Sequence, residues 1–172
     1  IKTKKPILWN LENQITGDSI HLLFNIDNNQ LDSLLVYNNA LIINKDSLGT
    51  GFNQISGQKL YGNFINNELK KIDIIKNAES IYYLRNSENE LVGIDRSKSG
   101  KIKILLDNNS IKKFIKINQI DGNTYPEEDF LEELKFLKGF YFREEEKPNS
   151  IKDLFKDDPK LILTKIKSLQ IN

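Results

Sequence analysis

The chain has 172 residues, and its 25 Lys and Arg residues nearly balance 24 Asp and Glu residues, for a formal net charge of +1. This balance gives no long-range field toward nucleic acid, and the lack of cysteine excludes disulfides, thiolate catalysis and Cys-ligated metals. No apolar stretch approaches the roughly 20 residues of a membrane-spanning helix. The sequence starts at Ile1 and contains no Met, so we expect a processed chain, compatible with removal of an export signal.

The first 14 residues begin with a basic stretch, which is followed by Ile7, Leu8 and Trp9. We expect these three apolar residues to form a short strand. Because terminal copies of a repeat shield the end of a stack, this strand is predicted to cover the first of the repeats that follow.

From residue 15 onward one phrase recurs about every 40 residues, a period typical of stacked supersecondary units. The copies span residues 15–53, 54–96 and 97–125. Each contains a glycine, a run of alternating apolar residues, an Asn-rich turn and a second apolar run. Alternation puts one set of side chains on one face of a strand, and Asn tolerates the positive φ of tight turns. Each copy therefore predicts a β-hairpin, or two strands joined by a tight corner, and the predicted fold class is mainly β.

The returning run of a copy breaks its alternation once. The break lies between Leu31 and Leu34 in the first copy and between Leu69 and Ile72 in the second. One extra residue on one strand of an antiparallel pair produces such a slip. The sequence therefore predicts a β-bulge in these two returning strands.

The first strands of the three hairpins carry apolar side chains that share one face. The eight inward positions are Ile20, Leu22, Phe24, Leu60, Phe64, Ile102, Ile104 and Leu106. One hairpin cannot bury such a face, whereas three or more stacked copies can. A continuous aliphatic lining suits an alkyl chain, whose burial is worth about 0.8 kcal/mol per methylene. It equally suits a closed core, and the pattern alone favours neither.

The pattern changes after residue 123. Pro126, followed by three acidic residues, suits the start of a helix, apolar residues recur at helical spacing up to Leu137, and Gly139 suits its end. Ser150 and Asp158 mark two more short helix starts, and residues 161–169 form a weak amphipathic pattern. We therefore expect a β domain over residues 1–125 and a helical C-terminal extension over residues 126–172.

Histidine and aspartate provide the candidate chemistry. His21 is the only histidine, and alternation places it opposite the apolar face. Asp18, Asp27, Asp32 and Asp73 supply carboxylates, which glycoside hydrolysis needs in pairs, but no pair recurs between copies. Turn or solvent-facing roles are favoured for all four. We expect no catalytic, cofactor-binding or metal site.

Two further motifs suggest anionic ligands. Gly49-Thr50-Gly51 lacks the Lys-Ser/Thr of a phosphate loop and is predicted to be a flexible loop. A cluster of basic residues around one aromatic resembles the composition of a single-strand nucleic-acid groove. It comprises Lys101, Lys103, Lys112, Lys113, Phe114 and Lys116. Alternation favours an outward, solvated sheet face for these lysines, and we expect no nucleic-acid partner.

Five short phrases, taken in order, resemble the OstA-like (organic solvent tolerance) family, and more closely its bacteroidete branch. They are Pro6-Ile7-Leu8-Trp9, Ile15-Thr16-Gly17-Asp18-Ser19-Ile20, Asn77-Ala78-Glu79-Ser80-Ile81-Tyr82-Tyr83, Ser97-Lys98-Ser99 and Leu137-Lys138-Gly139-Phe140. The resemblance covers about residues 6–155. This family is related to the periplasmic LptA bridge and to the amino-terminal domain of the LptD translocon.

The resemblance implies a β-jellyroll, or β-taco, in which V-shaped hairpins stack around an open hydrophobic groove. It implies residence in the periplasm, in association with the outer membrane, and carriage of lipopolysaccharide with the lipid A acyl chains in the groove. The groove residues would be the eight inward positions above, without catalysis or a cofactor. Other lipopolysaccharide-transport proteins would be partners, joined edge to edge by β-augmentation. The segment from Pro126 departs from the short bridge proteins, which lack it.

Two other functions stay open as alternatives. One is a structural adaptor in a cell-envelope complex, which would bind partners through its sheet edges and residues 126–172. The other is a hydrolase that uses Asp18 or His21.

Overall fold

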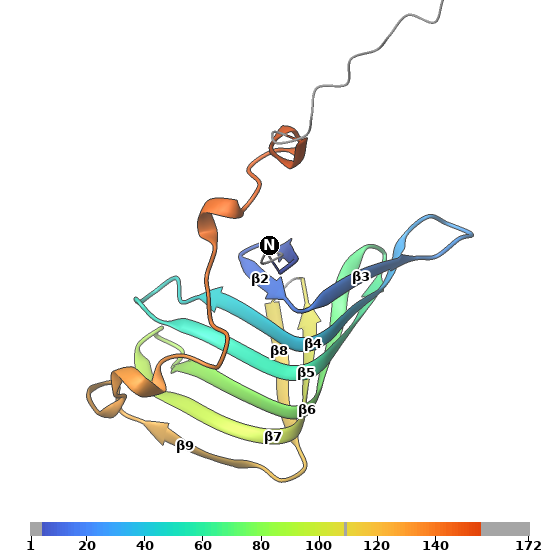
Figure 1. The fold of residues 1–172 in the computed structure, drawn as a ribbon. Coiled ribbons are helices and arrows are strands. Elements are labelled where there is room, and N and C mark those ends of the chain that lie inside the picture. The colour runs from blue at the N-terminus through green and yellow to red at the C-terminus, as the bar shows by residue number, and fades with distance from the viewer. Residues whose placement is uncertain (1–4, 109, 156–172) are drawn as a thin grey trace, which may run out of the picture. The chain divides into compact units, whose positions relative to one another are not determined.

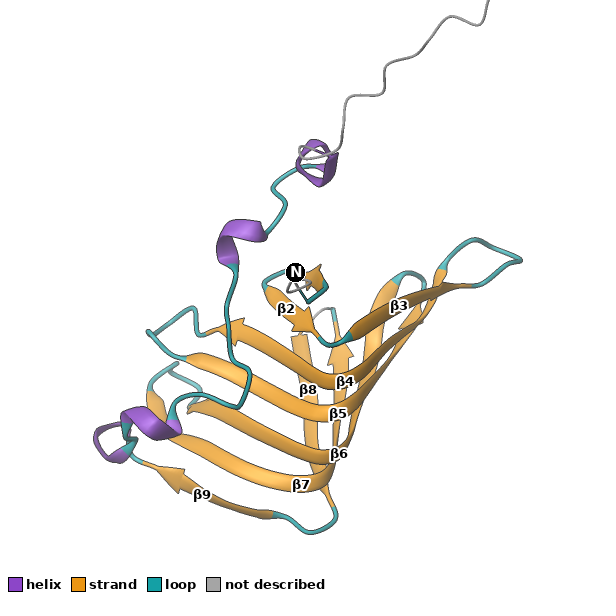
Figure 2. Ribbon diagram, in the orientation of Figure 1, coloured by secondary structure: helices purple, strands orange, loops and turns teal. Residues whose placement is uncertain are grey.

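The computed structural model describes residues 5–108 and 110–155. The chain divides into two compact units, with the boundary between Phe142 and Arg143. The first unit is built from a single open antiparallel sheet (Figures 1 and 2), so the prediction of a mainly β protein is confirmed. Its strands are β1 (Ile7–Asn10), β2 (Asn13–Thr16), β3 (Ser19–Phe24), β4 (Leu31–Lys45), β5 (Phe52–Ile65), β6 (Glu68–Arg85), β7 (Leu91–Asp107), β8 (Ser110–Ile117) and β9 (Asp121–Tyr125).

The strand order explains how a repeated hairpin makes one sheet. The main path runs β1-β2-β4-β5-β6-β7-β8, while β3 also pairs with β4 and β9 also pairs with β7. The long strands β4 and β7 therefore each carry two partner strands along one edge. One half of β4 pairs with β2 and the other half with β3, and β7 divides in the same way between β9 and β8.

Each long strand bends where its two halves meet. The pairing of β4 with β5 is interrupted between Tyr37 and Ala40, and the pairing of β6 with β7 between Ile75 and Ala78. Four residues within these interruptions have positive φ, between 51° and 62°. They are Asn38, Asn39, Lys76 and Asn77. Asparagine adopts this left-handed conformation more readily than most residues, so the repeated Asn-containing phrase builds a bend in the sheet.

The repeat glycine lies at the same bend. A Cβ atom on Gly57 would come within 2.4 Å of Cγ2 of Ile74 on the neighbouring strand. Only a residue without a side chain fits this close approach of two strands. Strand contact at the bend therefore explains the glycine of the second copy, and a Cβ on Gly17 of the first copy would likewise lie 2.2 Å from Cγ1 of Val36.

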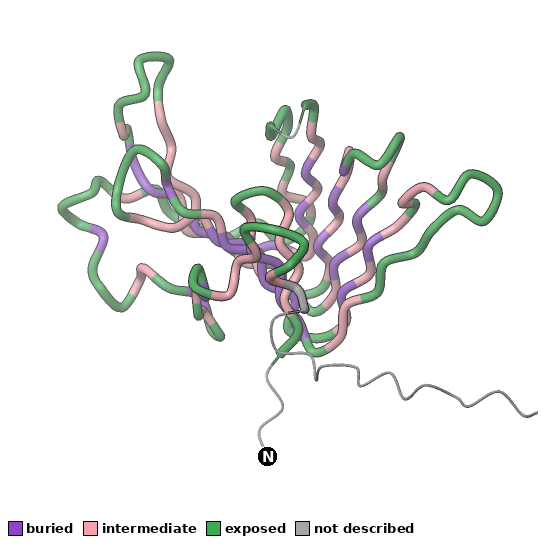
Figure 3. The backbone as a smooth tube through the Cα atoms, turned by 90° about the horizontal axis from the view of Figure 1, so that it is seen from above, coloured by how far each residue is buried: buried purple, intermediate pink, exposed green. Residues whose placement is uncertain are grey.

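The bend divides the sheet into two arms, which Figure 3 shows diverging from a common line. The first arm contains β1, β2, β9 and residues 40–45, 52–56, 78–85 and 91–99. The second contains β3, β8 and residues 31–37, 59–65, 68–75 and 101–107. Their inner faces meet in one buried cluster, and the first arm has a second cluster on its outer face.

Residues 126–142 cover the outer face of the first arm. Phe130 and Leu137 from this segment are each 3% exposed and pack with Ile43, Ile81 and Ile94 of the sheet. We call residues 126–142 the covering segment, the arm beneath it the covered arm and the other the bare arm. The outer face of the bare arm carries the lysines of residues 59, 71, 101 and 103.

The predicted bulges are present. Between β3 and β4, Leu23 pairs with Ser33 and Phe24 with Leu31, so Asp32 is the extra residue. Between β5 and β6, Asn63 pairs with Lys71 and Phe64 with Leu69, which leaves Lys70 as the extra residue. The three-residue spacing in the sequence therefore returns the apolar side chains to the inner face.

The predicted helix from Pro126 to Gly139 is wrong. The segment forms two 3-10 turns, η1 (Glu127–Asp129) and η2 (Glu132–Leu134), with irregular backbone around them. Buried Gln54 explains part of the difference, because its amide donates to the carbonyl of Lys135 at 2.7 Å and accepts from the N–H of Leu137 at 2.8 Å. These bonds replace hydrogen bonds that a helix would have made within itself.

The second unit is short within the described residues. It contains the 3-10 turns η3 (Glu144–Glu146) and η4 (Ile151–Phe155). The N–H groups of Asn149 and Ser150 donate to the carboxylate of Asp153 at 2.9 and 2.8 Å, which agrees with the helix start predicted at Ser150. The start predicted at Asp158 and the pattern over residues 161–169 lie outside the described residues.

Candidate functional site

The inner face of the bare arm is built from apolar side chains in three cross-strand rows. The row nearest the bend runs through Ile20, Val36, Leu60, Ile74 and Ile102. The next row contains Leu22, Leu34, Ile72, Ile104 and Phe114. The outermost row contains the pairs Phe24 with Leu31, Phe64 with Leu69 and Leu106 with Ile111. All eight residues predicted to line a groove therefore lie on this one face.

These eight residues differ in burial. Leu60, Ile102 and Ile104 are buried, and the half-buried Ile20, Phe64 and Leu106 pack against the same cluster. Leu22 and Phe24 are 37% and 55% exposed. Both belong to β3, which is the last strand of the bare arm on its side, so no further strand covers them.

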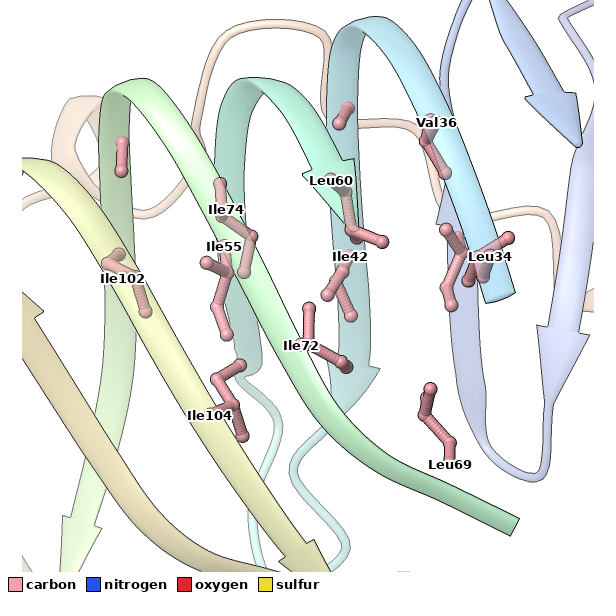
Figure 4. Packing of buried hydrophobic residues seen from close by; sticks show 13 residues of the cluster. Leu34, Val36, Ile42, Ile55, Leu60, Leu69, Ile72, Ile74, Ile102 and Ile104 are labelled. Carbon is pink, nitrogen blue, oxygen red and sulfur yellow. The ribbon is translucent and has the colours of Figure 1, made fainter. Parts of the chain in front are cut away.

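Near the bend the two arms pack directly against each other. Ile42 and Ile55 of the covered arm share a buried cluster with Ile72 and Ile74 of the bare arm (Figure 4). The sequence left open whether the two walls form a closed core or leave a slot. Both descriptions apply, at different distances from the bend. The part near the bend is a core.

Farther from the bend, the arms border an open cavity of about 300 Å³. Its apolar lining comes from both arms and comprises Ile15, Ile42, Ile55, Leu69, Ile72, Ile104, Leu106 and Ile111. Its polar lining comprises Asn10, Asn13, Asn44, Asn53, Tyr82 and Ser110. The volume is at the lower end of the range for small-molecule sites, which are mostly apolar with a few placed polar groups.

The arms are also connected across the inner space on the side of β8. Lys116 of the bare arm forms an ion pair with Asp95 of the covered arm, and the ring of Tyr82 lies 5.7 Å from that of Phe114. Ser97 donates its hydroxyl to Asp95 at 3.0 Å. The prediction that Lys116 faces outward is therefore wrong, because its register opposite Ile102 places it on the inner face.

The residues considered for catalysis are not brought together with this cavity. His21 is exposed on the outer face of the bare arm, where its ring lies 5.7 Å from that of Tyr37. Asp18 lies at the bend, 2.9 Å from both Lys5 and Asn39. The hydrogen bond from Lys5 holds the pKa of Asp18 below its ordinary value. Such a carboxyl stays ionised near neutral pH and is poorly suited to general acid catalysis.

The other aspartates have local partners. Asp27 lies in the β3–β4 turn, where its N–H donates to Asn25 Oδ1 at 2.8 Å, and Asp32 accepts from the Ser33 hydroxyl at 2.6 Å. Asp73 lies 2.8 Å from both Lys71 and Lys101 on the outer face of the bare arm. These contacts agree with the turn and surface roles that the sequence suggested.

Two sets of amide side chains in the structure were not predicted from the sequence. Gln14 and Gln54 are completely buried under the covering segment and donate to its backbone, Gln14 to the carbonyl of Tyr141 at 2.8 Å. The other set is the four asparagines of the cavity. The sequence carried no clear signal for the glutamines, because Gln14 and Gln54 lie in the polar stretches Asn13-Gln14-Ile15-Thr16 and Asn53-Gln54-Ile55-Ser56, which do not mark a buried amide.

Comparisons of the chain with protein-family models, curated proteins and solved structures gave no significant match. In the part of the chain that the structure describes, the helical segments are too short or too polar to cross a membrane. The same residues include no group of three or more His, Cys, Asp or Glu side chains placed to hold a metal ion. The cavity between the arms is therefore the strongest candidate for a functional site.

Proposed function

We propose that the chain binds lipid and accommodates an acyl chain in the cavity between the two arms. The observation that carries this proposal is the apolar lining of the cavity of about 300 Å³. Its isoleucine and leucine side chains continue outward from the buried cluster near the bend. An alkyl chain gains about 0.8 kcal/mol for each methylene that it buries. A surface of isoleucine and leucine offers this gain without any directional requirement, which suits a flexible chain.

The wider role that we propose is lipopolysaccharide transport in the periplasm, as part of a bridge to the outer membrane. This proposal rests on the resemblance to the OstA-like family, and two bent arms with an apolar space between them are compatible with its β-jellyroll. The ligand would be lipopolysaccharide, with lipid A acyl chains inside. A cavity of 150 Å³ holds one benzene molecule, so 300 Å³ suits one chain and a lipid with several chains requires the arms to separate.

The second candidate function is a structural adaptor in a cell-envelope complex. The observation in its favour is that the sheet is open: β1 and β3 on one side, and β8 and β9 on the other, have no further strand beside them among the described residues. Free strand edges recruit a strand of a partner by β-augmentation. The same edges would join neighbouring transport proteins if the chain is a bridge component.

Ile111 provides the test of acyl-chain binding. It lines the cavity and is 44% exposed on β8, so an Ile111→Asp variant introduces a charge into the site at small cost in stability. Ile115→Asp is a matched control, because Ile115 lies on the outer face of the same strand and is 37% exposed.

The measurement is photocrosslinking of the purified protein to lipopolysaccharide and to palmitate that carries a diazirine on its chain. We expect Ile111→Asp to lose crosslinking at least tenfold and Ile115→Asp to keep it. Native mass spectrometry of protein from a membrane extract should also show retained acyl lipid. Absence of both crosslinking and retained lipid in the unmodified protein would contradict the proposed lipid-carrier function and favour the structural adaptor.

A further inference from the structure

Four asparagines form a continuous row across four neighbouring strands of the covered arm. Asn10 on β1 pairs with Asn13 on β2, Asn13 with Asn44 on β4, and Asn44 with Asn53 on β5. All four line the cavity. Neighbouring strands are about 4.8 Å apart, so the row extends over roughly 14 Å.

A row of isoleucines runs parallel to the asparagines and one step closer to the bend. Ile15, Ile42 and Ile55 pair with one another across β2, β4 and β5, each two residues from an asparagine of the same strand. Residues two apart on a strand share a face. The covered arm therefore presents an amide row and an aliphatic row side by side to the same cavity.

The amides have hydrogen-bonding groups to spare. Asn13 donates Nδ2 to the carbonyl of Asn10 at 3.0 Å, and Asn53 Oδ1 accepts from the N–H of Tyr83 at 2.9 Å. These two bonds fix the side chains of Asn13 and Asn53. Within the described residues, Oδ1 of Asn13, Nδ2 of Asn53 and both side-chain groups of Asn44 make no protein hydrogen bond, so two acceptors and two donors are presented along the row.

The cavity has no charge of its own. None of the described residues that line it carries a charged side chain, and Lys116, on the same inner face, is paired with Asp95. An anionic head group would have to leave water without a cationic partner, which is costly. An uncharged ester, amide or hydroxyl group can exchange its hydrogen bonds with water for bonds to the asparagines.

We propose that the cavity selects a single-chain neutral amphiphile, whose ester, amide or hydroxyl group bonds the asparagine row while its alkyl chain lies on the isoleucine row. This inference rests on the proposed acyl-chain binding and adds the class of polar group that the site accepts. In a lipid with several chains, the part recognised would be the uncharged linkage of one chain.

The test compares four probes on the full chain: 1-monopalmitoylglycerol, palmitamide, palmitate and hexadecane. We expect the first two to bind at least fivefold more tightly than palmitate at pH 8, measured by displacement of a fluorescent fatty-acyl probe. An Asn44→Ala variant should weaken the binding of monopalmitoylglycerol about two- to tenfold, which corresponds to one hydrogen bond. The affinity for hexadecane should not change. Asn63→Ala, on the outer face of the bare arm, is the matched control and should change neither.

The outcomes separate this inference from the proposed function. Tight binding of palmitate and hexadecane, with no effect of Asn44→Ala, would contradict recognition of a polar group by the asparagine row and would still support acyl-chain binding. Equal weakening of all four probes by Asn44→Ala would also contradict this recognition, because it would give the row a purely structural role. Failure of every probe to bind would overturn both proposals.

Discussion

The two arms share the same four long strands, yet only one of them is covered on both faces. The covered arm has its inner face in the cluster near the bend and its outer face beneath residues 126–142. The bare arm buries only its inner face, and its outer face carries lysines, Asp73 and half-buried apolar side chains such as Leu35 and Leu105, without a covering segment among the described residues. The covered arm is therefore a two-layer structure, and the bare arm depends on it for burial.

This difference suggests how a ligand could enter. Stability within a protein is not uniform, and regions with few buried apolar contacts open at low free energy. The bare arm has one apolar contact layer, so its outer end is the part of the sheet that can separate from the cavity at the lowest cost. The covered arm, which carries the asparagine row, would stay in place and hold the polar group of the ligand.

The largest expected effect comes from removing the cover. Phe130 is 3% exposed, with its ring 5.6 Å from that of Tyr125 and 6.4 Å from that of Tyr83. A Phe130→Ala variant should lose about 3–5 kcal/mol of unfolding free energy, because truncation leaves a cavity in a buried site. Chemical denaturation in urea measures this loss.

Ile115→Ala is the matched change on the outer face of the bare arm. Ile115 is 37% exposed, and substitutions at such surface positions usually change stability by about 0.5 kcal/mol or less. A loss for Ile115→Ala as large as that for Phe130→Ala would mean that the bare arm has a cover of its own. The contrast between the two arms would then be wrong.

The sequence predicted the strands and the faces better than the tertiary arrangement. Alternation identified the inner residues, and the spacing of Leu31 and Leu34 identified a bulge, because both signals are local. The family resemblance implied V-shaped hairpins, and the Asn-rich turns allowed a tight corner, but neither located the bend within a continuous strand. Gly57 and the Asn38-Asn39 pair are compatible with a turn, and only the pairing of β4 with β5 on both sides of them makes a continuous bent strand.

The covering segment and the site depended on contacts between distant residues. Phe130 and Leu137 have helical spacing. Their burial on the covered arm, and the hydrogen bonds of Gln54 with Lys135 and Leu137, determine the backbone conformation instead, and these partners lie 81 and 83 positions from Gln54 in the sequence. Likewise, the cavity asparagines are single residues in four strands. They become one row only when the strand order places β2 beside β4.

A smaller effect is expected at the bend, where the two arms are joined. A Cβ on Gly57 would lie 2.4 Å from a methyl carbon of Ile74, whereas a Cβ on Gly100 would lie 3.2 Å from its nearest neighbour, Cβ of Asn118. Gly57→Ala should therefore cost about 1–3 kcal/mol through overpacking, and Gly100→Ala clearly less. Thermal and urea unfolding of both variants compares them, and equal stability of the two would show that the bend adjusts freely.

The smallest effect concerns the outer face of the bare arm, where Asp73 forms ion pairs with Lys71 and Lys101. Burial of the Asp73 carboxyl opposes its ionisation, but hydrogen bonds from Lys101 and Lys71 outweigh burial and lower the pKa of Asp73 below its ordinary value. A lowered pKa in the folded state stabilises the fold above the pKa of the unfolded chain, about 3.9, and this contribution is lost as the pH falls through the folded value.

An Asp73→Asn variant should therefore be less stable than the unmodified protein by up to about 1 kcal/mol at pH 7, and the difference should narrow as the pH is lowered toward 3. Urea denaturation at several pH values measures it. Asp107→Asn is the control, because Asp107 lies 3.9 Å from Lys112 and both side chains are more than half exposed. A difference that persists unchanged at low pH would show that Asp73 acts through packing, and the bare arm would then resemble the covered arm more closely than its lysines suggest.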